Sequence, residues 1–360
     1  MLAGDGGSGR GHVARRILRL VVKEIKEVLL LLYSNQSGDD GFPFHVAAAL
    51  SMAHFARCGA SVGLAWQVAC TPAPSRQRRW DMWREASSKA TQTLSYRDYQ
   101  ETAPPQDAVL QINKDVNRTG DTSTVSPQSL RRVLLAHAAR NPRIGYTQGL
   151  NFVAAALLRA RPPSAEEAEA FWLLCALTEA VLPDYYVPSL IGVRVDGLVI
   201  EALLLEHDSL FDLPTIFAEA GFELGVVTPH WFMLAFSQTL PREVSLRVWD
   251  LLFAQGSRVL LATALALLRC QAPRLREARC DFGTVYDLLR QPEASSISAA
   301  ELLGALIGEL HRLPAARVSA LRHEHRPPTK SADDLLRHQH YRNLFRARGG
   351  AGCEQRMALV

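Results

Sequence analysis

Asn141-Pro142-Arg143-Ile144-Gly145-Tyr146-Thr147-Gln148-Gly149-Leu150-Asn151-Phe152 separates two helical patterns. Apolar residues recur at helical spacing before this stretch, over 129–140, and after it, to about residue 159. Its proline and its two glycines favour a turn. The pattern therefore predicts a helix end, a turn and a second helix that Gln148 opens, with its amide side chain between two glycines.

A second polar stretch lies upstream and reads Ile112-Asn113-Lys114-Asp115-Val116-Asn117-Arg118-Thr119-Gly120. Taken alone, an arginine in a loop beside an aspartate is usually part of a surface ion pair. Here the apolar Ile112 can anchor the segment. Asp115 can brace Arg118, so that less side-chain entropy is lost when the guanidinium engages a ligand. We therefore treat Arg118 as a candidate functional residue.

Gln148 needs the same comparison between a structural and a functional role. A glutamine at a helix start is usually a cap or a solvent contact. Gly145 and Gly149 can let a partner approach the backbone beside it, because glycine has no side chain. Tyr146 offers a flat, rigid surface that carries a hydroxyl. Our hypothesis is that Arg118 and Gln148 act together on a phosphate that belongs to another protein.

Helical periodicity dominates the rest of the chain, and no segment carries a hairpin signal. Ser164 and Glu167 match a capping box, with Ser164 as the N-cap and Glu167 at N3. Pro229 is expected in the first turn of a helix. We therefore predict an all-α fold. Its later helices are expected at 195–207, 231–240, 241–250, 259–268, 298–310 and 315–323.

Composition excludes several classes of protein. Apolar residues make up 48% of the 360 residues and charged residues 21%, as in a soluble globular protein. A net charge of +4 is too small to indicate nucleic-acid binding. The chain has no Walker A sequence, so it is not expected to bind a nucleotide by itself.

Residues that could bind a metal are sparse. The six cysteines form no CxxC pair, which argues against a zinc ribbon or a thioredoxin motif. Four histidines cluster near the C-terminus, but their spacing matches no firm zinc pattern and neighbouring arginines would repel a cation. We predict no metal site. These histidines are His323, His325, His338 and His340.

The two ends of the chain differ from its centre. Residues 1–11 are glycine-rich and expected to be disordered, and residues 327–360 form a basic tail that we expect to be flexible. Residues 12–65 are expected to form a helical extension. Its first, amphipathic helix either packs on the domain or a partner helix, or lies on a membrane surface. Residues 42–70 fit either two buried helices or a transmembrane segment, and the arginine-rich start also fits a transit peptide.

Four motifs follow one another in the central part. They are Pro72, Arg76 and Trp80; Ile112-x-x-Asp115-x-x-Arg118-Thr119; Tyr146-x-Gln148-Gly149-x-Asn151-Phe152; and Trp231 to Phe236 with Arg247-Val248-Trp249-Asp250 and Gly256-Ser257. Their order and intervals resemble those of the TBC domain, the family of GTPase-activating proteins for Rab-type small GTPases. The resemblance covers about residues 66–326 and implies a two-lobed, multi-helix domain. The second motif resembles the family's arginine finger and the third its glutamine finger.

The resemblance also implies roles for individual residues. Arg118 would reach into the active site of a partner GTPase and stabilise the charge that develops toward the leaving phosphate. Gln148 would align the attacking water. Independently of the resemblance, Asp250 is expected to be a structural hydrogen-bond acceptor rather than a catalytic base. The implied supporting residues are Asp115, which would orient Arg118, and Thr119, Tyr146, Gly149 and Asn151.

GTP and Mg²⁺ would be carried by the partner, so the resemblance implies no cofactor-binding or metal-binding residue in this chain. The expected activity is that of a GTPase activator rather than of a stand-alone hydrolase. The expected partner is a Rab-family GTPase in its GTP form, and no nucleic acid is expected. The expected location is cytoplasmic, or peripheral on endomembranes through the partner or the N-terminal amphipathic helix, with a role in vesicle trafficking. The alternative is a TBC-fold scaffold that binds a GTPase or another trafficking partner without accelerating hydrolysis.

Overall fold

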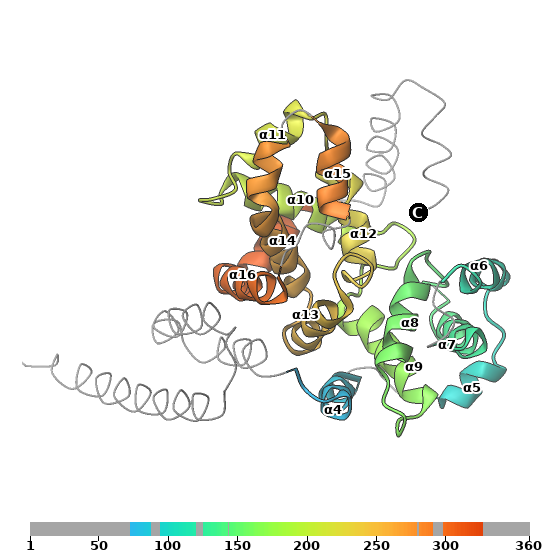
Figure 1. The fold of residues 1–360 in the computed structure, drawn as a ribbon. Helices are drawn as coiled ribbons and strands as arrows, with labels where there is room; N and C mark the ends of the chain where they lie inside the picture. The colour runs from blue at the N-terminus through green and yellow to red at the C-terminus, as the bar shows by residue number, and fades with distance from the viewer. Residues whose placement is uncertain are drawn as a thin grey trace, which may run out of the picture. The chain divides into compact units, whose positions relative to one another are not determined.

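The computed structural model describes residues 73–87, 94–119, 125–142, 144–278, 281–290 and 298–326 (Figure 1). Every described residue belongs to one of the two units into which the chain divides, the one that begins at residue 67. The predictions for residues 1–11, 12–65 and 327–360, and the place of Pro72, lie outside the described residues. All regular secondary structure in the described ranges is helical, which confirms the all-α prediction.

The first group of helices leads up to the glutamine-bearing stretch and past it. Apolar faces at helical spacing bury large side chains here, among them Trp80, Ile112, Leu134 and Phe171. The last helix runs directly into a π-helical turn. The members are α4 (Arg76–Ser87), α5 (Tyr96–Glu101), α6 (Gln106–Val116), α7 (Pro127–Arg140), α8 (Leu150–Ala160), α9 (Glu167–Ala176) and the π-helix η1 (Leu177–Val181).

The second group completes the fold. Trp231, Phe232 and Phe236 lie in its core, and the long helix α14 contacts most of its neighbours. The members are α10 (Ile191–Leu205), α11 (Leu213–Glu219), the 3-10 helix η2 (Leu224–Val226), α12 (Thr228–Met233), α13 (Arg242–Gln255), α14 (Arg258–Glu277), α15 (Phe282–Arg290), α16 (Ala299–Arg312) and α17 (Ala315–His325). The two groups correspond to the two predicted lobes.

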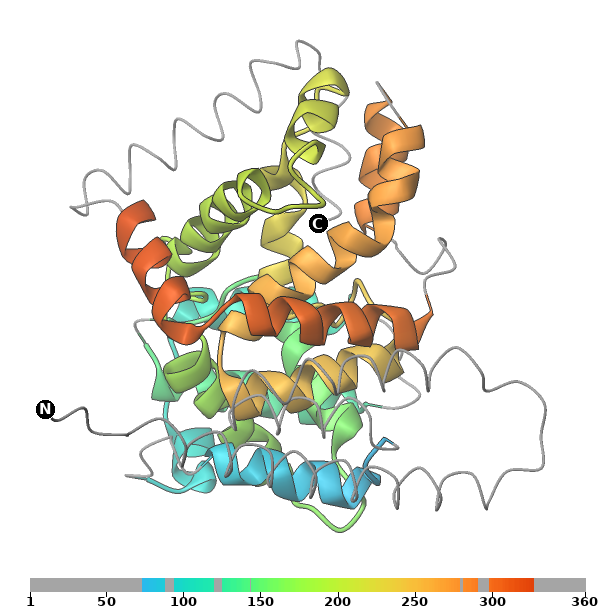
Figure 2. The same ribbon diagram turned by 90° about the vertical axis from the view of Figure 1, so that its left-hand side faces the viewer.

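Helix α13 joins the two groups. It contacts α4 on one side and α16 on another, and Figure 2 shows α4, α13 and α16 lying one above the other. Asp250 on α13 accepts hydrogen bonds from Arg79 Nε and Trp83 Nε1, each at 2.9 Å. The carboxylate is buried, and burial raises the pKa of Asp250 although Arg79 opposes this. Asp250 is therefore a structural acceptor, as the sequence predicts.

The predicted capping box is wrong. Helix α9 begins at Glu167, and its N-cap is Glu166, which forms a capping box with Glu169. Ser164 instead donates to Gln77 Oε1 at 2.7 Å. The Glu167 carboxylate accepts from Arg132 Nη2 at 2.7 Å and so is not available for a cap. Tertiary partners have displaced the local motif.

Other boundaries also differ from the prediction, and α14, expected to end at 268, continues to Glu277. The helix expected over 231–240 ends at Met233, because Ala235 and Phe236 have positive φ angles of 44° and 61°. Trp249 Nε1 holds this turn by donating to the carbonyl of Ala235 at 2.8 Å. Gln148 does not open a helix either, since α8 begins at Leu150. The first-turn position of Pro229 is confirmed.

Within the described ranges, no helix is both long and apolar enough to cross a membrane. The segment 42–70, for which a transmembrane helix was one prediction, is not among them. The same ranges contain no group of three or more histidine, cysteine or acidic side chains arranged to hold a metal ion. His338 and His340 lie outside these ranges, whereas His323 and His325 lie in α17.

Candidate functional site

Arg118 lies in the short turn that follows α6, and its side chain is exposed. Its backbone N–H donates to the carbonyl of Asp115 at 3.0 Å. The hydroxyl of Thr119 donates to the same carbonyl at 2.6 Å. The last turn of α6 thus fixes the backbone on both sides of the arginine, while the guanidinium extends from the surface.

The carboxylate of Asp115 faces inward and is only 5% exposed. It accepts hydrogen bonds from the Tyr146 hydroxyl at 2.9 Å and from Gln111 Nε2 at 3.2 Å. No ion pair joins it to Arg118 in the described part of the chain. The sequence suggested that Asp115 would brace the guanidinium of Arg118. In the structure Asp115 instead holds the backbone of Arg118. Burial, and then the charge of Asp115, raise the pKa of Tyr146, so its hydroxyl stays a donor.

Asn151 connects the arginine turn to the glutamine turn. Its Nδ2 donates to Thr119 Oγ1 at 3.0 Å, and its Oδ1 accepts from the N–H of Gly149 at 3.1 Å. Since Asn151 is 2% exposed, these bonds are protected from water. Together with the bond between Tyr146 and Asp115, they hold the turns that carry Arg118 and Gln148 next to each other. The structure thus brings together all seven predicted site residues.

Gln148 is exposed, and its turn is also attached to the second lobe. The hydroxyl of Thr147 donates to the carbonyl of Tyr186 at 2.8 Å. The hydroxyl of Tyr186 donates in turn to the carbonyl of Met233 at 2.9 Å. Sequence reasoning missed Thr147 and Tyr186, because a threonine in a turn and a tyrosine after a proline break carry no specific signal. They fix the backbone immediately before Gln148.

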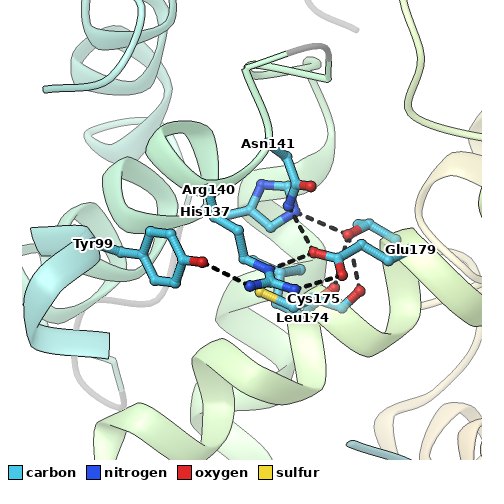
Figure 3. A network of polar contacts seen from close by, with 8 residues as sticks. Tyr99, His137, Arg140, Asn141, Leu174, Cys175 and Glu179 are labelled. Carbon is cyan, nitrogen blue, oxygen red and sulfur yellow. Dashed lines mark hydrogen bonds and ion pairs between the residues drawn. The ribbon is translucent and has the colours of Figure 1, made fainter. Parts of the chain in front are cut away.

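A polar network holds the start of the same turn (Figure 3). Arg140, the last residue of α7, donates through Nε and Nη2 to both carboxylate oxygens of Glu179, at 2.7 and 2.9 Å. Asn141 Nδ2 donates to Oε1 of Glu179 at 2.9 Å, and Arg140 Nη1 donates to the Tyr99 hydroxyl at 2.9 Å. Burial raises the pKa of Glu179, but hydrogen bonds from Arg140 and Asn141 outweigh it, so the net pKa is lowered.

Glu179 is a positioning residue that sequence reasoning missed. It lies in the π-helical turn η1, and π-turns of this kind are often found at functional sites. The only local signal was Arg140-Asn141 at the end of a predicted helix. Glu179 lies 39 residues from Arg140 and 38 from Asn141, and no sequence pattern links residues at such separations.

The two glycines of the turn have different structural roles. Gly149 has a φ of 102° and is the N-cap of α8, and a Cβ there would lie 3.0 Å from Leu234 Cδ2. Gly145 has a φ of 58°, and a Cβ there would meet nothing within 4 Å. Gly149 is buried. Its lack of a side chain therefore permits its own left-handed backbone and the close packing against Leu234. The expectation that it opens the backbone to a partner is wrong for Gly149.

This difference gives a testable pair of variants. Gly149→Ala is expected to destabilise the fold by about 1–3 kcal/mol, because strained backbone and a close contact add together. Gly145→Ala should cost only about 1 kcal/mol, the penalty of a left-handed backbone alone. Urea denaturation of the two variants and wild type measures the difference. Equal losses of unfolding free energy in the two variants would contradict the role assigned to Leu234.

Comparison with known proteins settles the family of this fold. The Rab-GTPase-TBC domain model matches residues 63–276, more than half of the 360-residue chain. The chain belongs to the TBC domain family. The matched range contains Arg118, Gln148 and the residues that join their turns, so the TBC domain includes the whole candidate site.

Relatives of this TBC domain are longer proteins. Small G protein signaling modulator 3 of Rattus norvegicus is 33% identical over 247 residues, which is 66% of this chain and 32% of the relative. TBC1 domain family member 2A of Mus musculus is 33% identical over 230 residues, 61% of this chain and 24% of the relative. This chain thus spans about a third or less of the length of these relatives.

Solved structures agree on the fold of the TBC domain. The flagellar RabGAP TBC domain of Chlamydomonas superimposes with a TM-score of 0.54 at 22% identity, covering 85% of this chain and 97% of that one. The Ypt/Rab-GAP domain of Gyp1p gives a TM-score of 0.50 at 18% identity, covering 81% and 97%. At these identities the likeness concerns the fold alone.

Proposed function

We propose that this TBC domain accelerates GTP hydrolysis by a Rab-family small GTPase in its GTP form. One observation carries the proposal: two exposed side chains, Arg118 and Gln148, lie on adjacent turns that are joined by buried and partly buried hydrogen bonds. Rigid backbones with exposed polar side chains suit insertion into another protein's active site. The domain would act in the cytoplasm or on endomembranes and regulate vesicle trafficking.

The chemistry needs charge neutralisation and an oriented water more than covalent catalysis. GTP and Mg²⁺ are the partner's substrate and ion, and the metal neutralises charge on the β- and γ-phosphates. Arg118 would place its guanidinium against oxygens that gain charge as the γ-phosphate leaves. Gln148 would hydrogen-bond the attacking water in line with that phosphate. Since both turns are fixed beforehand, little entropy is lost on forming the transition state.

The test is single-turnover GTP hydrolysis across a panel of Rab GTPases. Wild type is expected to accelerate hydrolysis by at least one of them. Gln148→Ala should lower that acceleration by about 10²-fold, since a misplaced water costs about this much. Gln106→Ala, which removes an exposed glutamine at the start of α6, is the matched control and should act as wild type.

The scaffold alternative predicts a different result in the same assay. A scaffold would bind a GTP-loaded Rab without changing its rate of hydrolysis. Binding by wild type together with no acceleration of any Rab would therefore replace the proposed activity with the scaffold function. A Gln148→Ala variant as active as wild type would keep the activity but remove Gln148 from its mechanism.

A further inference from the structure

The residues on either side of Gln148 are held from outside their own turn. Before it, the hydroxyl of Thr147 donates to the carbonyl of Tyr186 at 2.8 Å. After it, a Cβ placed on Gly149 would lie 3.8 Å from Met233 Cε, so the backbone there packs against the end of α12. Gln148 is thus flanked by two contacts whose partners come from elsewhere in the chain.

Tyr186 connects these two contacts. It lies between η1 and α10 and is completely buried. Its hydroxyl donates to the carbonyl of Met233 at 2.9 Å. Burial raises the pKa of Tyr186, so the hydroxyl keeps its proton and remains a donor. Tyr186 is therefore bonded to the glutamine turn through its carbonyl and to α12 through its hydroxyl.

The geometry at the end of α12 explains why this hydroxyl is held. A helix leaves its last carbonyls without partners inside the helix. Met233 is the last residue of α12, and the helix does not continue, because Ala235 and Phe236 have positive φ angles. The hydroxyl of Tyr186 gives the carbonyl of Met233 a partner. This bond fixes Tyr186 and, with it, the carbonyl to which Thr147 donates.

The turn that carries Arg118 has other anchors. The backbone N–H of Arg118 donates to the carbonyl of Asp115 at the end of α6. Asn151 connects this turn to the glutamine turn, and its bonds do not involve Tyr186 or α12. A change at Tyr186 is therefore expected to displace Gln148 and to leave Arg118 in place.

We infer that Tyr186 is a positioning residue for Gln148, and that it acts through Thr147 on the alignment of the attacking water. The inference rests on the proposed GTPase-activating function. Since Tyr186 is buried, it does not reach the surface that a partner would contact. Loss of its hydroxyl should therefore slow stimulated hydrolysis without weakening the binding of the GTPase.

A double-mutant cycle with the most responsive Rab GTPase tests this role. Tyr186→Phe should lower the kcat of stimulated hydrolysis about tenfold and leave the KM for the GTP-loaded Rab unchanged, because a shifted Gln148 still aligns the water in part. In the Gln148→Ala background, Tyr186→Phe should have no further effect, since the side chain that it positions is gone. An equal loss in both backgrounds would overturn the inference, as would a raised KM with unchanged kcat.

Thr147 supplies a second pair of variants. Thr147→Val removes the hydroxyl that donates to Tyr186 and should lower kcat as Tyr186→Phe does. Thr147→Ser keeps the donor and should retain the rate of wild type. Tyr286→Phe, which removes the hydroxyl of a half-buried tyrosine on α15, is the matched control and should also act as wild type. Full activity of Thr147→Val would overturn the inference.

Hydrogen exchange of the free protein separates this inference from the proposed function, because it needs no GTPase. The amides of Gly145 and Leu150 are bonded within the glutamine turn. Tyr186→Phe should speed exchange over residues 144–150 several-fold and leave residues 112–119 unchanged. Unchanged exchange over residues 144–150 would overturn the inference even if wild type stimulates a Rab. A wild-type protein that stimulates no Rab would overturn the proposed function, and the kinetic role of Tyr186 with it.

Discussion

Arg118→Ala is expected to lower stimulated GTP hydrolysis by about 10³–10⁵-fold, or about 4–7 kcal/mol of barrier. The side chain is exposed, and its backbone bonds to Asp115 do not depend on it. The substitution should therefore remove a charge from the proposed transition state and leave the fold intact. Arg118→Lys should also be strongly impaired, since a lysine cannot make the paired contacts of a guanidinium.

Single-turnover hydrolysis with the most responsive Rab measures this effect, and thermal melting confirms that the variant is folded. Arg97→Ala is the matched control, because it removes an arginine whose side chain is 85% exposed and bonded only to Glu101 among the described residues. Its rate should equal that of wild type. Full activity of Arg118→Ala would show that another residue supplies the charge.

Glu179→Ala is expected to have the largest effect on stability, a loss of roughly 3 kcal/mol. The substitution leaves the guanidinium of Arg140, whose side chain is 8% exposed, without its bidentate partner, and it also releases Asn141. Breaking a buried ion pair is costly because the remaining charge has lost its water. Since Asn141 begins the turn that carries Gln148, stimulated GTP hydrolysis should fall as well.

Urea denaturation of Glu179→Ala and of Glu101→Ala measures the loss. Glu101 pairs with Arg97 at i, i+4 on an exposed helix face, with side chains 69% and 85% exposed, so its removal should cost at most about 0.5 kcal/mol. Similar losses in the two variants would mean that the network in Figure 3 contributes little.

The dependence on pH supplies an independent check of Glu179. Its pKa is lowered in the folded protein, so the unfolded chain binds the proton more readily. The stabilisation from Glu179 is therefore present above its unfolded pKa and is lost as the pH falls through the folded value. The difference in unfolding free energy between wild type and Glu179→Ala should shrink in that acidic range. A difference independent of pH would contradict the ion pair.

Helical periodicity and motif order predicted the fold and the exposed tips of the site. Arg118 and Gln148 could be found because each lies in a motif of fixed spacing, and spacing along the chain is visible in the sequence. The residues that hold these two turns in place were only partly predictable. Asp115 was identified, but its partner is Tyr146 and not the arginine.

The sequence by itself determined where the helices lie and which side chains the turns present, because helix formation and turn formation depend on neighbouring residues. Tertiary structure alone decided which distant groups meet. The pairing of Glu179 with Arg140 depends on how separate helices pack. Packing also decided the start of α9, where contacts of Ser164 and Glu167 with other helices replaced the predicted capping box. Local patterns fix local geometry, and burial then selects the hydrogen bonds that the packed helices can satisfy.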